Sequence, residues 1–305
     1  MAHRTSQLTL RERLWGYAFL SPWILGFLLF TAGPMVASLF LSFTDYNPVS
    51  AEGMQFVALD NWRAVFTDPV VRQSFWVTGR YVLLATPILI ATPLLLAVLL
   101  NARALPGKPL FRTLFYLPAM IPAVAATMCW LYILNPSTGW INRILGWFGI
   151  PGPDWVNSPE YAPIMFVLLV LWGIGPTIVI FLAALQGVPT ELYEAARVDG
   201  ASPLRSFIAI TIPMISPVIF YTLVIGVIAS LRYFMATYIV YNGTAGPGGV
   251  AQFYMLTLYR NAFVYYQMGY ASALAWVLFL VGLALTLVLF ASAKRWVYYA
   301  GSMDR

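Results

Sequence analysis

The chain has 305 residues, of which 61% are hydrophobic and only 9% are charged. Soluble domains carry about 25% charged residues, so a soluble enzyme and a disordered chain are excluded and an integral membrane protein is predicted. The net charge of +6 is expected to mark cytoplasmic loops and not a nucleic-acid-binding surface. With Cys129 as its one cysteine and His3 as its one histidine, the chain is expected to have no disulfide, no metal site and no histidine-based catalytic residue.

Six stretches are long and apolar enough to cross the membrane as helices, which takes about 20 residues each. They are predicted at Leu14–Phe43, Phe75–Asn101, Arg112–Leu134, Tyr161–Gly187, Met214–Val240 and Met268–Ala291. The predicted fold class is therefore an all-α polytopic membrane protein. All but the last stretch contain proline, which kinks helices and frees backbone carbonyls. Such groups need neighbouring helices or a wet cavity, so the prolines favour a bundle with an internal pathway.

The distribution of basic residues predicts the orientation. Of the 17 Lys and Arg, eleven lie in the two tails and in the loops after the second and fourth spans, and four lie in loops on the opposite side, namely Arg63, Arg72, Arg143 and Arg260. Because basic loops stay inside, both termini are expected in the cytoplasm. The first span lacks a small-residue cleavage site and is expected to be retained.

An outer segment after the first span, Leu59–Phe75, carries apolar residues at helical spacing. These are Trp62, Val65, Phe66 and Val70. The spacing fits a helix lying along the membrane surface, and it also fits a loop with scattered apolar anchors.

The cytoplasmic loop at about 188–213 has the local signals of two short helices joined by a sharp turn. Thr190 is expected to cap the first helix, and Gly200 to end it, since glycine adopts positive φ without penalty. Ser202 and Pro203 fit the cap and first residue of the second helix. The loop is therefore predicted to be a rigid projection, with an ordinary amphipathic connector as the alternative.

The same loop resembles the EAA loop of ABC importer permeases. The matching positions are Glu194, Ala195, Ala196, Asp199, Gly200, Ile210 and Pro213. Ile212 stands where that family usually has leucine, a mild departure. Further segments resemble the carbohydrate branch of the family, of the maltose and glycerol-phosphate type: 42–44, 56–62, 111–118, 135–142 and 269–273.

This resemblance implies a type I ABC importer permease fold, with 1–305 as a single transmembrane permease domain in a bacterial or archaeal plasma membrane. It implies that the EAA loop docks on a cytoplasmic ATPase dimer, and that the chain works with a second, unlike permease subunit, an extracytoplasmic solute-binding protein, membrane lipid and a sugar substrate. The chain has no phosphate-binding loop, because Gly107-Lys108 is followed by Pro109. It is therefore expected to be no enzyme and to bind no cofactor, with ATP and Mg bound by the partner ATPase.

The resemblance also implies that substrate passes between the fourth and fifth spans. The candidate residues there are Trp172, Gly173, Pro176, Gly226, Ser230, Arg232 and Tyr233. Aromatic rings suit the C–H faces of a sugar, although Trp and Tyr in membrane helices also serve packing. A charge inside a span costs about 2.5–3.5 kcal/mol on insertion scales, so Arg232 either faces the cavity or snorkels outward.

Two alternatives belong to other functional classes. An ion-coupled secondary transporter usually needs acidic residues within its spans, but all 11 Asp and Glu of this chain fall in tails, loops or span edges. A membrane-embedded enzyme needs clustered acidic or histidine side chains at the membrane face. Asp199-Gly200-Ala201 faintly resembles the opening of a phosphotransferase motif, but the later acidic residues of that motif are missing.

Overall fold

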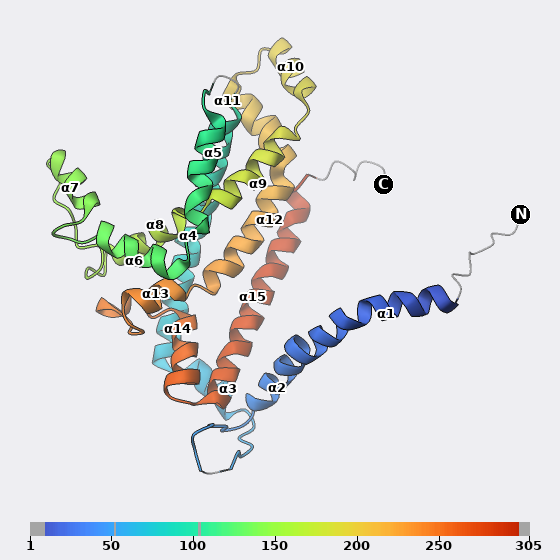
Figure 1. Ribbon diagram of the computed structural model, residues 1–305, viewed down its shortest axis with the longest axis vertical. Helices are drawn as coiled ribbons and strands as arrows, with labels where there is room; N and C mark the ends of the chain where they lie inside the picture. The colour runs from blue at the N-terminus through green and yellow to red at the C-terminus, as the bar shows by residue number, and fades with distance from the viewer. Residues whose placement is uncertain (1–9, 52, 103–104, 299–305) are drawn as a thin grey trace, which may run out of the picture. The chain divides into compact units, whose positions relative to one another are not determined.

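The computed structural model describes residues 10–51, 53–102 and 105–298 (Figure 1). Over these residues the regular structure is helical, apart from one isolated antiparallel bridge between Thr44 and Phe56. His3, Arg4, Arg103 and Arg305, which entered the charge and composition arguments, lie outside the described residues. The all-α prediction is confirmed, whereas the cytoplasmic placement of both termini stays a prediction.

The chain divides into two compact units. The first comprises residues 1–66 and 261–276, and the second comprises 67–260 and 277–305. The first unit holds α1 Leu10–Phe27, a π-helical turn at Leu28–Ala32, α2 Gly33–Leu41, all but the last residue of α3 Asp60–Thr67 and all but the first residue of a π-helical turn at Arg260–Val264. The last helix, α15 Met268–Trp296, contributes residues 268–276 to the first unit and the rest to the second.

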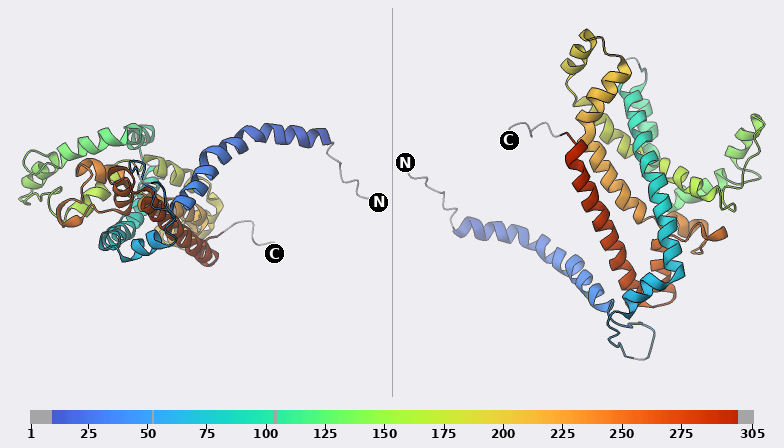
Figure 2. Two further views of the ribbon diagram at one scale, coloured as in Figure 1. Left: turned by 90° about the horizontal axis from the view of Figure 1, so that it is seen from below. Right: turned by 180° about the vertical axis from the view of Figure 1, so that it is seen from behind.

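The second unit holds the remaining elements. These are α4 Pro69–Asn101, α5 Lys108–Tyr116 with a 3₁₀ turn at Leu117–Met120, α6 Ala123–Ile133, α7 Trp140–Trp147, α8 Ala162–Leu171, α9 Gly175–Gln186, α10 Thr190–Val198, α11 Pro203–Ser206 with a π-helical turn at Phe207–Thr211, α12 Ile212–Leu231, α13 Met235–Val240, a 3₁₀ turn at Pro247–Gly249 and α14 Tyr254–Tyr259. In Figures 1 and 2 the α10–α11 pair lies at one extremity of this unit, and α7 stands far from it beyond α6 and α8.

In the first unit, hydrogen bonds join segments that the sequence analysis matched separately to the carbohydrate branch. Asn61 Nδ2 donates to the carbonyl oxygens of Ser42 at 3.0 Å and Thr44 at 2.7 Å. Trp62 Nε1 donates to Ser42 Oγ at 3.1 Å. A Cβ atom at Gly269 would collide with the Thr44 carbonyl, so this position requires glycine. The helical alternative for Leu59–Phe75 is confirmed at α3, and α4 begins directly after it.

The core of the second unit is formed by α4, α9 and α12. Leu94, Phe181, Leu185 and Ile215 are buried in one apolar cluster there. The start of α4 is fixed by Asp68, whose carboxylate accepts a hydrogen bond from the Val70 N–H at 2.7 Å, as expected of an N-cap residue. These three helices form the scaffold on which the broken helices are held.

Several predicted spans are interrupted. Four helices are long and apolar enough to cross a membrane, and two bent helix pairs raise the number of spans to as many as six among the described residues. The third predicted span, Arg112–Leu134, is not one helix but two, bent by 105° between Met120 and Ala123. The cause is a proline pair, because Pro118 lies in the 3₁₀ turn and Pro122 has an extended ψ of 138°.

The fourth and fifth predicted spans are also broken. The fourth bends by 58° between α8 and α9, at Trp172–Ile174. The helical path of the fifth span is interrupted after Leu231, because Phe234 has φ −146° and ψ −56°. By contrast, α4 continues through Pro87 and Pro93, and α12 through Pro217. Proline alone therefore does not determine where the helices break.

The segment between α7 and α8 is fastened to the end of α13. Tyr241 Oη donates to the Val156 carbonyl at 2.6 Å, and burial raises the pKa of Tyr241 to about 12. The Asp154 carboxylate accepts the backbone N–H of Asn157 at 2.9 Å, and this hydrogen bond lowers the pKa of Asp154. Both groups keep their usual protonation state at neutral pH, so the hydrogen bonds that hold this segment do not change with pH in that range.

Candidate functional site

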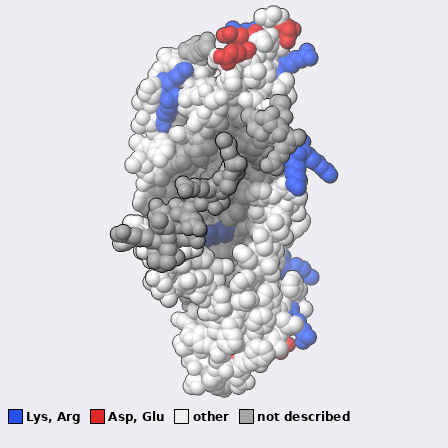
Figure 3. All heavy atoms as spheres, turned by 90° about the vertical axis from the view of Figure 1, so that its right-hand side faces the viewer, with Lys and Arg blue, Asp and Glu red and all other residues white. Residues whose placement is uncertain are grey.

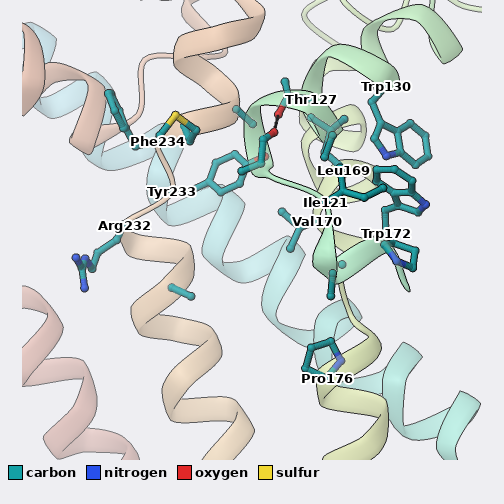
Figure 4. A pocket seen from close by; sticks show the side chains of 18 residues that line it. Ile121, Thr127, Trp130, Leu169, Val170, Trp172, Pro176, Arg232, Tyr233 and Phe234 are labelled. Carbon is teal, nitrogen blue, oxygen red and sulfur yellow. Dashed lines mark hydrogen bonds between the residues drawn. The ribbon is translucent and has the colours of Figure 1, made fainter. Parts of the chain in front are cut away.

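A cavity of about 590 Å³ lies where the three helix breaks of the second unit meet (Figure 4). Its walls come from the α5–α6 break, the α8–α9 break and the α12–α13 break. The lining is mostly apolar and includes Pro118, Ile121, Thr127, Trp130, Leu169, Val170, Trp172, Gly173, Pro176, Arg232, Tyr233 and Phe234. The cavity therefore lies between the helix ends at these three interruptions.

Two indole rings form one wall of the cavity. Trp130 of α6 and Trp172, the residue after α8, make an edge-to-face pair with centroids 6.1 Å apart and planes at 83°. Trp130 Nε1 is buried and has no hydrogen-bond partner among the described residues. Buried donors are nearly always paired, so this wall holds an unsatisfied polar group beside the space that a ligand would occupy.

Tyr233 lies on the opposite side of the cavity from the two indoles in Figure 4. Its ring stacks on Tyr81 of α4 with centroids 4.6 Å apart. Its hydroxyl donates to the Phe166 carbonyl of α8 at 3.4 Å. Stacking and hydrogen bonding together hold this ring against the buried cluster that contains Tyr81 and Phe166, at the edge of the cavity.

Arg232 is the charged residue among those that line the cavity. It follows the last turn of α12, and its side chain is exposed. In Figure 4 the guanidinium points away from Trp130 and Trp172. The charge therefore lies at the rim of the cavity and not against the aromatic wall.

Five of the seven predicted pathway residues line the same cavity: Trp172, Gly173, Pro176, Arg232 and Tyr233. Gly226 and Ser230 are not part of the lining. Ser230 is buried with 3% exposure, and a Cβ at Gly226 would lie 3.9 Å from Thr86 Cγ2 of α4. These two positions face the packing between α12 and its neighbours.

Sequence reasoning missed the wall contributed by the third span. Pro118, Ile121, Thr127 and Trp130 line the cavity, but a straight helix at Arg112–Leu134 gives no reason to place them there. The available signal was the presence of Pro118 and Pro122, because a proline biases the residue before it away from the helical conformation.

The second candidate region is the EAA loop, and most of its predicted local structure is confirmed. Gly200 has a φ of +74°, and Ser202 Oγ accepts from the Arg205 N–H at 3.3 Å as the N-cap of α11. The cap predicted at Thr190 is wrong: Pro189 occupies the cap position and no side chain caps α10. The second helix is not a separate short one either, because α11 continues through a π-helical turn into α12.

The predicted loop residues differ in exposure. Glu194, Ala195, Asp199 and Gly200 are exposed, whereas Ala196, Ile210 and Pro213 are half-buried. In Figure 3 acidic side chains gather at the end of the molecule that carries α10. Glu191 and Glu194 belong to that helix and Asp199 follows it directly. The loop therefore offers an exposed tip, with three carboxylates and the basic Arg197, on a half-buried base.

Tyr193 connects α10 to the base of α12. Its hydroxyl and Thr211 Oγ1 are 2.8 Å apart, in a hydrogen bond that either group can donate. Thr211 is buried and closes the π-helical turn that precedes α12. The Tyr193 ring packs against the apolar cluster of α4, α9 and α12. A groove of about 810 Å³ runs beside this contact, with Asn101, Arg197 and Phe207 in its lining.

The comparisons with known proteins identify the family. Residues 72–298 match the family described as binding-protein-dependent transport system inner membrane component. The chain belongs to this family. A probable ABC transporter permease protein, YesP of Bacillus subtilis, is 42% identical over 301 residues, covering 98% of this chain and 96% of YesP.

Two other relatives have names that state which compound their transport system carries. The arabinooligosaccharides transport system permease protein AraP of Bacillus subtilis is 33% identical, covering 89% of this chain and 86% of AraP. The sn-glycerol-3-phosphate transport system permease protein UgpA of Salmonella typhimurium is 31% identical, covering 97% of this chain and 99% of UgpA. A chain of a bacterial alginate ABC transporter, crystallised with an alginate pentasaccharide-bound periplasmic protein, matches with a TM-score of 0.82 and 25% identity, covering 93% of this chain and 95% of that one.

Membership confirms that the chain is a multi-pass permease subunit of the inner membrane and not itself an enzyme. The type I permease fold implied by the EAA resemblance is confirmed by the structural match. The secondary-transporter and membrane-enzyme alternatives do not fit this family.

Proposed function

We propose that this permease forms one half of the translocation pathway of an ATP-driven importer for a sugar or sugar derivative. The observation that carries the proposal is the cavity at the three helix breaks, with Trp130 and Trp172 on one wall and Tyr233 on the other. Its volume of about 590 Å³ lies within the usual range for small-molecule sites, about 300–1,000 Å³. Flat aromatic faces pack against sugar C–H surfaces, and Trp and Tyr add polar groups.

The substrate class also has support from the relatives. AraP and UgpA are named for systems that transport arabinooligosaccharides and sn-glycerol-3-phosphate, and the matched alginate transporter handles an acidic polysaccharide. By analogy with these relatives, we infer that the substrate of this chain is a carbohydrate or polyol derivative. Arg232 at the cavity rim is available to an anionic group of such a substrate.

The partners follow from the proposed role. A solute-binding protein delivers the substrate on the outer side, a second and unlike permease subunit completes the pathway, and a cytoplasmic ATPase dimer binds ATP and Mg. The EAA loop docks on that ATPase, where Glu194 pairs with a basic group. Support comes from the exposure of Glu194 and Asp199 and from the fixed turn at Gly200, because a rigid projection transmits a displacement that a flexible loop would absorb.

Trp172→Ala tests the cavity as a sugar path. We expect ATP-dependent uptake to fall roughly tenfold, equivalent to about 1.4 kcal/mol, because an aromatic face for the sugar is lost while the half-buried position leaves assembly intact. The measurement is uptake of a panel of radiolabelled mono- and oligosaccharides by cells that lack the native copy and express the variant.

Trp76→Ala is the matched control, since Trp76 is 66% exposed on α4 and is not part of the cavity lining. Equal uptake by the two variants, or uptake that persists when cellular ATP is depleted, contradicts the proposal.

Arg232→Ala separates the two interpretations of this charge. If the guanidinium meets substrate at the rim, uptake of an anionic sugar derivative falls several-fold and uptake of a neutral sugar changes less. The amount of assembled complex stays the same, because the side chain is exposed. Unchanged uptake of both classes leaves Arg232 as a snorkelling residue. Side-by-side uptake assays with one neutral and one phosphorylated sugar give the answer.

Tyr193→Phe tests the link between the EAA loop and α12. The variant keeps the ring in the apolar cluster but removes the hydrogen bond to Thr211, which contributes about 0.5–1.5 kcal/mol. We expect sugar transported per ATP hydrolysed to fall roughly two- to tenfold, while ATP hydrolysis itself persists. Thr211→Val is the partner variant, and combining both should add little to either alone. Additive losses contradict a shared hydrogen bond as the cause.

A further inference from the structure

The N-terminal half of α4 has an exposed face on which two arginines lie above apolar residues. We call it the arginine face, and its members, which follow one another at helical spacing and so share one side of the helix, are Arg72, Arg80, Leu83 and Pro87. All four are exposed, Leu83 to 78%. In the right-hand view of Figure 2, α4 (cyan to teal) runs along the side of its unit that faces the reader.

The two guanidinium groups have no acidic partner in the described part of the chain, because the ion pair found there involves neither of them. Asp68 lies one turn before Arg72, but its carboxylate accepts the Val70 N–H at the start of α4. The guanidinium carbon of Arg80 is 5.6 Å from the ring centroid of Trp76. That contact positions the cation without neutralising it. The arginine face therefore presents two positive charges and no anion.

The length of the apolar part of α4 places the arginines at the level of the lipid headgroups. After Arg80 the exposed residues of α4 are apolar as far as Leu99. This stretch is about 28 Å long at about 1.5 Å per residue, close to the ~30 Å of the hydrocarbon core. Arg80 therefore lies at the edge of the core, and Arg72, about 12 Å further along the helix axis, lies outside it. Trp76, between the two, is of a residue type that gathers where a membrane meets water. The anion at this depth is the phosphate of a phospholipid.

We propose that the arginine face of α4 is a binding site for an anionic phospholipid. The phosphate lies between the two guanidinium groups, and one acyl chain runs along Leu83 and Pro87. Guanidinium groups suit this role because they donate paired hydrogen bonds to phosphate oxygens and keep their charge at any physiological pH. A zwitterionic lipid also has a phosphate, but its ammonium group offsets the charge. Two cations therefore favour a lipid with a net negative headgroup.

The second permease subunit is a poorer occupant of this face, an argument that rests on the proposed function. That subunit completes the pathway, so it approaches the side of the unit on which the cavity lies. The helix α4 meets that side through Tyr81, which stacks on Tyr233 of the cavity lining. Arg72 precedes Tyr81 by about two and a half helical turns and therefore lies on the opposite side of α4. A solute-binding protein is excluded by depth, because the arginine face continues to Pro87, within the hydrocarbon core.

Native mass spectrometry of the importer complex, purified through a tag on this chain, tests the proposal. The complex is stripped of its own lipid in detergent and titrated with phosphatidylglycerol or with phosphatidylcholine of the same acyl chains. Arg72→Gln combined with Arg80→Gln removes both charges from the face. Arg63→Gln combined with Arg143→Gln is the matched control, because it removes the same charge from two exposed positions outside α4. Neither sugar nor ATP is present, so failure of the proposed transport function would leave the lipid result unaffected.

The wild-type complex and the control should bind phosphatidylglycerol roughly fivefold more tightly than phosphatidylcholine, about the preference that one arginine near an anionic lipid surface provides. The double glutamine variant should lose this preference. Arg72→Lys combined with Arg80→Lys should keep most of it, because the charges remain, and this variant shows that the loss is not caused by misfolding.

An unchanged preference in the glutamine variant overturns the proposal. If that variant also loses the second permease subunit from the complex, the face binds protein and not lipid. An equal loss in the control means that the preference follows net charge alone, and this overturns the proposal as well. Glycerophosphoglycerol, which has the headgroup without acyl chains, should not compete with the lipid. Competition at equal concentration would mean that the arginines bind a free phosphate ester instead.

Discussion

Gly175→Val is expected to abolish the accumulation of folded permease, while Gly173→Ala, two residues away, leaves folding intact. Gly175 begins α9, and a Cβ there would collide with the Phe115 carbonyl and approach the Tyr116 Cα at 2.7 Å. Both atoms belong to backbone, which cannot rotate aside. Overpacking of this kind costs typically about 1–3 kcal/mol even where side chains can adjust, and a branched side chain against backbone should cost more.

The comparison between the two glycines isolates the cause. Gly173 lies in the same helix break but is exposed, and a Cβ there would meet only the Val170 carbonyl at 3.7 Å, an ordinary contact. The measurements are the amount of variant in membranes and its monodispersity and melting temperature after mild extraction. Gly175→Val with wild-type abundance and melting temperature would show that α5 and α9 are not held together at this point.

This close approach also explains why the cavity exists at all. The contact between Gly175 and the end of α5 fixes the α8–α9 break beside the α5–α6 break, and the α12–α13 break completes the lining. The cavity therefore depends on backbone positions remote in sequence, and side chains then give it an aromatic character. Substitutions at Gly175 should therefore affect folding, whereas substitutions at Trp172 should affect uptake.

The sequence was informative where the physical rule is local. Composition and span length predicted the helical membrane class, and positive φ at Gly200 and the Ser202 cap followed from residue type and spacing. The predicted Thr190 cap failed by one position, because Pro189 with ψ 132° already supplies the extended conformation of a cap and leaves Thr190 as the first helical residue.

The cavity was harder to predict because it arises from tertiary packing. A hydropathy analysis identifies the apolar run at Arg112–Leu134, but it does not detect the 105° bend within that run. Proline is an ambiguous marker, since Pro87 and Pro93 sit inside an uninterrupted α4, whereas Pro118 and Pro122 flank a break. Trp130 was overlooked for this reason, while Trp172 and Tyr233 were found through resemblance to a family and not through any local signal.

Under the proposed coupling role of the EAA loop, substitutions at Gly200 should have the second large effect, on transport and not on folding. A Cβ at Gly200 would meet nothing within 4 Å, but the φ of +74° disfavours other residues. The left-handed conformation costs an ordinary L-residue roughly 1–2 kcal/mol, and asparagine tolerates it best. Gly200→Val should therefore displace the α10 tip relative to α11 and reduce ATP-coupled uptake by about tenfold, whereas Gly200→Asn should retain most of it.

The valine and asparagine variants together distinguish turn geometry from close approach by a partner. If Gly200 is needed because its backbone must adopt positive φ, uptake follows the order Gly, Asn, Ala, Val. If instead the ATPase approaches so closely that no side chain fits, Asn and Val are equally damaging, and the turn account is wrong. The measurement is sugar uptake alongside ATP hydrolysis by the purified complex. Because the space around Gly200 is open within this chain, any steric loss with asparagine would have to come from a docked partner.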